Sequence, residues 1–143
     1  MTQQILIQKN HGTPPPKFIV YPNIASVWRN DQTVTWILAG GLFWDPPPDA
    51  PAPENLPVFF LPEDETHSAW PSDQPSPLGQ LTGNEQDKRL YVAFAGVIIP
   101  TGELPVTYHW AAWVNDGAGR ERIQMVHPTG VLIDPDLVNQ PYP

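Results

Sequence analysis

The sequence contains no cysteine, and this absence excludes several kinds of site at once. Disulfide frameworks, thiolate nucleophiles, zinc ribbons and iron–sulfur clusters all require cysteine sulfur. A chain without disulfides depends on its hydrophobic core, and 143 residues are enough to bury one substantial core. We therefore expect residues 1–143 to form a single domain, and the lack of cysteine fits a reducing compartment.

Basic residues are also scarce. Seven lysines and arginines stand against fifteen aspartates and glutamates, which gives a net charge of -8. Nucleic-acid binding depends on clustered lysine and arginine that neutralise phosphates, and the seven basic residues here form no run. We therefore expect no nucleic-acid partner.

Long apolar runs are absent as well. No stretch approaches the roughly 20 apolar residues that a helix needs to span a bilayer. Residues Met1–Gln4 lack the basic and apolar regions of a signal peptide. The sequence as written therefore predicts a cytoplasmic protein with no membrane partner.

Proline, by contrast, is abundant, with 20 residues in the chain. Proline removes a backbone donor and breaks helices, whereas loops and edge strands tolerate it. Apolar and polar residues alternate in several segments, most clearly in Thr33–Leu38 and Val106–Val114. These features predict an all-β Greek-key sandwich of seven to eight strands, with residues 130–133 closing the sheet.

Residues 45–77 form a long excursion with a composition of its own. It holds ten prolines, seven acidic residues and no lysine or arginine. Irregular stretches of this length within a domain are uncommon and are often functional. The apolar run Val58–Leu61, bounded by prolines, predicts one short strand inside it. Because proline lowers the entropy lost on ordering a loop, the excursion is a candidate contact surface.

Four segments occur in an order that resembles the cupredoxin fold. That family has an early strand with a proline-containing corner, a Val-x-Trp strand, a long variable region and a late Tyr-x-Tyr-x-Cys strand. The corresponding segments here are Phe18–Pro22, Thr33–Trp36 (TVTW) and Val106–Ala112 (VTYHWAA). The ending Val131–Leu137 resembles the Asp-Pro-Asp tails of cupredoxin-like proteins that lack a blue-copper site. The resemblance covers most of the chain and implies the fold.

The copper chemistry of that family does not carry over. A blue-copper site needs two imidazoles, a thiolate and a weak axial thioether, and the motif places Ala112 where the thiolate belongs. No histidine closely follows the strand that ends near Trp36, since the next one is His67. Met125 and His127 follow Ala112 at a longer spacing than the usual ligand loop. Fold alone does not define function, and we expect no cofactor.

The four histidines give a weak signal for another kind of metal site. Imidazole is a common ligand for Zn, Cu and Ni, but no pair here has a spacing such as His-x-His or His-x-x-x-His. Four independent histidines are the favoured interpretation. If a site exists, its candidate ligands are His67, His109 and His127, and His109 should point away from the neighbouring strand aromatics.

Two tryptophans beside the excursion offer an alternative function. Exposed indole rings of Trp44 and Trp70 could stack on sugar rings, while Asp64 and Glu65 accept sugar hydroxyl hydrogens. The competing interpretation is that both indoles pack the excursion onto the sheet. Trp36 and Trp110 lie in alternating strands and are predicted to be core residues.

Catalytic patterns are missing from the sequence. It has no Gly-x-Ser-x-Gly elbow, no phosphate-binding loop and no dinucleotide-binding glycine pattern. We therefore predict a non-catalytic protein-interaction or structural module, whose partner is another protein or a second copy of the chain. Its candidate contact residues are Trp44, Trp70, Asp64 and Glu65. A carbohydrate-binding module is the alternative, and a histidine-based metal-binding protein is the third hypothesis.

Overall fold

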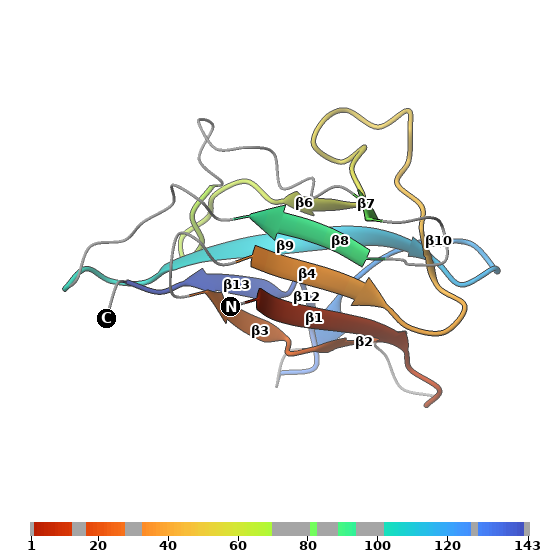
Figure 1. Ribbon diagram of the computed structural model, residues 1–143, viewed down its shortest axis with the longest axis horizontal. Coiled ribbons are helices and arrows are strands. Elements are labelled where there is room, and N and C mark those ends of the chain that lie inside the picture. Colours follow the sequence, from red (N-terminus) through yellow and green to blue (C-terminus); the bar gives the residue numbers. More distant parts are fainter. Residues whose placement is uncertain are drawn as a thin grey trace.

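The computed structural model describes residues 2–12, 17–27, 33–69, 81–82, 89–93, 102–126 and 129–141. These residues form strands and loops and no helix, so the predicted all-β class is confirmed (Figure 1). Accordingly, the described segments contain no helix with the length and apolar character that crossing a membrane requires. The strands are β1 Thr2–Lys9, β2 Phe18–Tyr21, β3 Ile24–Val27, β4 Thr33–Leu38, β5 Phe43–Trp44, β6 Val58–Phe60, β7 Leu81–Thr82, β8 Arg89–Ala93, β9 Val106–Asn115, β10 Arg120–Arg122, β11 Met125–Val126, β12 Leu132–Ile133 and β13 Asp136–Asn139.

The first sheet has the strand order β2-β1-β4-β8-β7. Its centre is a parallel pair in which β1 runs beside β4, with Ile5 opposite Trp36 and Ile7 opposite Leu38. Successive side chains of a strand point to opposite faces, so the alternating apolar residues of each strand share one face. Ile5, Ile7 and Trp36 are fully buried on that face.

The second sheet has the order β10-β9-β13-β3, and β5 and β6 also pair with β9. We expected residues 130–133 to close the sheet, and this prediction was wrong. Within the described residues β12 pairs with β11, whereas β13 lies between β9 and β3. The short strand β13 follows Pro135 and was interpreted as a tail, but its Leu137 and Asn139 are buried.

Two tryptophans, one from each sheet, meet in the core. Trp36 of β4 and Trp110 of β9 are fully buried. Their ring centroids lie 5.6 Å apart with an interplanar angle of 74°, an edge-to-face arrangement that aromatic pairs favour. The two layers visible in Figure 1 therefore pack as a sandwich, and the prediction that both tryptophans are core residues is confirmed.

Part of the excursion, residues 46–57, interrupts a single strand that runs beside β9. β5 pairs with the end of β9 through Trp44 and Val114, and β6 resumes through Val58 and Ala112. Between them, the carbonyl oxygen of Trp113 accepts the Asp45 N–H at 3.1 Å, and the Trp113 N–H donates to the Pro57 carbonyl at 2.9 Å. In an uninterrupted antiparallel ladder, the single residue opposite Trp113 would both donate to its carbonyl and accept from its N–H. Here Asp45 and Pro57 share that role, so residues 46–57 are an insertion into a continuous ladder.

Deletion of residues 46–57 should therefore leave the fold intact. Joining Asp45 to Val58 restores one residue opposite Trp113, and shortening a surface loop changes its closure entropy only slowly. We expect cooperative urea unfolding with a free energy within about 1 kcal/mol of the parent. The matched control, deletion of 46–58, shifts the register by one residue and turns the following side chains of β6 to the opposite face. If both deletions lowered the free energy of unfolding equally, residues 46–57 would not be an insertion into a continuous ladder.

Candidate metal centre

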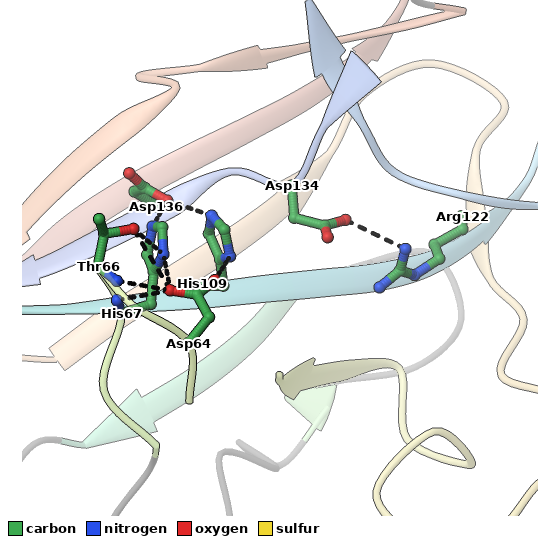
Figure 2. A network of polar contacts seen from close by, with 7 residues as sticks. All are labelled: Asp64, Thr66, His67, His109, Arg122, Asp134 and Asp136. Atoms are coloured by element: carbon green, nitrogen blue, oxygen red, sulfur yellow. Dashed lines mark hydrogen bonds and ion pairs between the residues drawn. The ribbon is translucent and has the colours of Figure 1, made fainter. Parts of the chain in front are cut away.

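The fold brings His67 and His109 into direct contact. His109 belongs to β9, and His67 lies in the loop of residues 61–69 that follows β6 (Figure 2). Both ends of this loop are bonded to β9: the Leu61 N–H donates to the His109 carbonyl at 2.9 Å, and the Ser68 N–H to the Thr107 carbonyl at 2.8 Å. The two imidazoles consequently stack, with ring centroids 3.2 Å apart and an interplanar angle of 22°.

A carboxylate lies at each end of the stacked rings. At one end, Asp64 Oδ1 is 2.8 Å from His67 Nδ1, and Asp64 Oδ2 is 3.6 Å from His109 Nδ1. At the other end, Asp136 Oδ1 is 3.1 Å from Nε2 of both histidines. Figure 2 shows the ring pair between these two carboxylates, which come from the loop and from β13.

Local backbone geometry holds Asp64 in place. Its Oδ1 accepts the backbone N–H of Thr66 and that of His67, each at 2.8 Å, as is common for aspartate in a turn. The bond from Thr66, followed by the contact with the His67 ring, lowers the pKa of Asp64 to about 2. Asp64 is therefore an anion at neutral pH.

A third carboxylate nearby, that of Asp134, is directed elsewhere. Its side chain points away from the histidines toward Arg122, with Oδ1 3.2 Å from the guanidinium Nη1 (Figure 2). Burial raises the pKa of Asp134, and the charge of Arg122 opposes that shift. The ion pair with Arg122 leaves Asp64 and Asp136 as the carboxylates that face the imidazoles in the part of the chain that the structure describes.

The site is open enough for an ion to enter from solvent. The exposed side-chain fractions are 12% for His67, 19% for His109, 25% for Asp136 and 48% for Asp64. Ligand atoms of Asp64, His67 and His109 lie within 4.8 Å of one another. Two imidazoles with carboxylate oxygen form a donor set that suits Zn²⁺, Ni²⁺, Cu²⁺ and related ions.

The other predicted contact residues do not join this cluster. Trp44 pairs with Val114 of β9 and packs against the core, in agreement with the packing interpretation of this indole. Glu65 is exposed in the same loop as Asp64. Trp70 and His127 lie outside the described residues. The sequence prediction thus named His67, His109 and Asp64 separately, and the structure brings them together.

Asp136 is the member of the cluster that sequence reasoning missed. In the sequence it belongs to the Asp-Pro-Asp tail, which follows the last expected strand at residues 130–133. No periodic signal in the sequence marks it, because the two apolar residues Leu137 and Val138 are adjacent, and only the burial of the strand alternates. Pairing places Asp136 directly opposite His109. The prediction that His109 points away from the core aromatics is confirmed, since Trp110 is fully buried and His109 is not.

Comparison with protein-family models, curated proteins and solved structures finds no match to this chain. The resemblance to cupredoxins and the Greek-key connectivity therefore stay predictions. The all-β sandwich itself rests on the strand pairing and the shared core. Because fold alone does not define function, the function has to be argued from the chemistry of the histidine cluster.

Proposed function

We propose that this domain binds one divalent transition-metal ion through His67 and His109 together with an aspartate. The observation that supports the proposal is the stacking of two imidazoles, from separate segments of the chain, between Asp64 and Asp136. With neutral imidazoles the two aspartates carry a formal charge of about -2, which a divalent cation balances. This was the third hypothesis from the sequence, and the cluster is the observation that supports it.

The donor set also favours particular ions. Ca²⁺ and Mg²⁺ prefer oxygen ligands, whereas imidazole nitrogen suits Zn²⁺, Co²⁺, Ni²⁺ and Cu²⁺. Two protons on the imidazoles would balance the same negative charge, so the test has to separate metal binding from protonation. We therefore carry out the titration near pH 8, where protons compete less with a metal ion for imidazole nitrogen than at lower pH.

The test is native mass spectrometry of untagged protein purified without chelator, followed by calorimetric titration of the stripped protein with Zn²⁺. We expect one ion per chain, because a metal-bound imidazole gives one nitrogen to the ion and keeps the other for an orienting hydrogen bond. The double variant His67→Ala/His109→Ala should bind at least about 100-fold more weakly, since even a residue that only supports a metal ligand is worth 10–100-fold.

The matched control is His11→Ala, which removes an exposed histidine of a different loop and should leave Zn²⁺ affinity unchanged. Absence of binding by Zn²⁺, Co²⁺, Ni²⁺ and Cu²⁺ to the parent protein would overturn the proposal. Equal loss of affinity in His11→Ala and in the double variant would overturn it as well, because binding would then not depend on this cluster.

The predicted interaction module is the second candidate, and the exposed insertion favours it. Asp49 and Glu54, within residues 46–57, face solvent. The ladder that β5 and β6 form with β9 does not need residues 46–57 to continue. A contact surface on the insertion can therefore be removed separately from the fold. The 46–57 deletion should lose the oligomeric state or partner capture of the parent. If it keeps both, the contact surface is not on the insertion.

A further inference from the structure

Each imidazole of the cluster has two nitrogens, and the two ends of the ring pair differ. A metal-bound histidine uses one nitrogen for the ion, and its other ring N–H usually donates to a carboxylate or a carbonyl that orients the ring. Here both Nδ1 atoms face Asp64, and both Nε2 atoms face Asp136. One carboxylate can therefore ligate the ion while the other holds the rings.

The Asp64 end is already occupied by protein donors. Asp64 Oδ1 accepts the backbone N–H groups of Thr66 and His67 and lies 2.8 Å from His67 Nδ1. The Thr66 hydroxyl oxygen lies 2.9 Å from the same ring nitrogen and 3.3 Å from Asp64 Oδ1. These contacts fix the carboxylate within its own loop and form a ready set of partners for Nδ1.

The Asp136 end brings one carboxylate oxygen close to both Nε2 atoms. Bonds of about 2.0–2.2 Å at tetrahedral angles place neighbouring ligand atoms roughly 3.3–3.6 Å apart. One Asp136 oxygen lies 3.1 Å from Nε2 of His67 and from Nε2 of His109. Two of these three residues are also on rigid elements, because Asp136 of β13 pairs directly with His109 of β9.

The geometry points to an ion held by His67 Nε2, His109 Nε2 and the Asp136 carboxylate, with Asp64 as a positioning residue at the Nδ1 atoms. This inference rests on the proposed function and assigns its ligands. Three protein ligands leave coordination positions of the ion to water, in contrast to a closed four-ligand structural site. The loop has to hold the His67 ring in place for the ion. Asp64 therefore affects metal affinity through its hydrogen bonds to the loop and to His67, without contacting the ion itself.

The first test follows the ring nitrogens themselves. Protein with ¹⁵N-labelled histidine is titrated with Zn²⁺, and long-range ¹H–¹⁵N correlation spectra assign each nitrogen of His67 and His109. We expect the Nε2 resonances of both rings to move to the metal-bound position, with Nδ1 protonated. Coordination through Nδ1 would overturn the assignment. This measurement uses the parent protein and does not depend on whether a variant folds.

The second test compares two isosteric variants. Asp136→Asn removes the charged ligand and should weaken Zn²⁺ binding by at least about 100-fold. Asp64→Asn keeps an oxygen for the backbone N–H groups and should cost 10–100-fold, with one ion still bound through Nε2. The reverse order of losses would overturn the assignment while leaving the proposed function standing. Failure of the parent protein to bind any of Zn²⁺, Co²⁺, Ni²⁺ and Cu²⁺ would instead overturn the proposed function.

Discussion

Replacing Trp110 by alanine is expected to lower the free energy of unfolding by about 3–5 kcal/mol, the usual cost of truncating a buried aromatic residue. Trp110 is fully buried in β9 and meets Trp36 of the opposite sheet edge to face. Its removal leaves a cavity between the two sheets. The free energy of unfolding of a whole domain is only about 5–15 kcal/mol. The urea concentration at the unfolding midpoint should therefore fall markedly.

The control for this substitution lies on the same strand. Trp113 of β9 faces the opposite side and is only half-buried, so Trp113→Ala should cost less than half as much. A double-mutant cycle with Trp36→Ala should also show non-additivity of about 0.5–1.5 kcal/mol from the ring pair. If Trp113→Ala is the more destabilising change, the core is not centred on the Trp36–Trp110 contact.

The strands of the core could be predicted because their side chains alternate. In β4 and β9 one alternating set of residues is apolar and buried, as Trp36 and Trp110 show, although Thr35 and Ala111 of the other set are buried too. Strands of two to four residues lack such a period. β5, with Phe43 and Trp44, and β13 were missed for this reason. Their strand character comes from pairing with β9, which is a tertiary contact.

The candidate metal centre could be predicted only as separate residues. His67 and His109 have no ligand spacing along the chain, and their contact depends on a loop whose two ends bond to β9. Asp136 reaches them because β13 pairs with the same strand in one particular register. Sequence patterns report local periodicity, whereas the register between distant strands is decided by how the whole sandwich packs. The site therefore results from the fold, and the spacing of the histidines along the sequence could not predict it.

Zinc is expected to stabilise the native protein strongly. An ion that binds only the folded state adds about 4.1 kcal/mol when its concentration is 1,000 times its dissociation constant. For a domain near this size each kcal/mol raises Tm by about 2–4 °C, so the expected shift in thermal unfolding is roughly 10 °C. The physical reason is that the ion joins His67 of the loop to His109 of β9 and Asp136 of β13, contacts that unfolding separates.

The comparison that decides this prediction is the zinc-induced shift in each protein, measured against its own metal-free Tm. His67→Ala/His109→Ala should show no shift, whatever its metal-free stability. Mg²⁺ should leave the parent unchanged because it prefers oxygen ligands, and a chelator should reverse the effect of Zn²⁺. An equal shift in the double variant would mean that zinc stabilises the domain from another site. A saturated parent protein with no shift would mean that the ion does not favour the folded state.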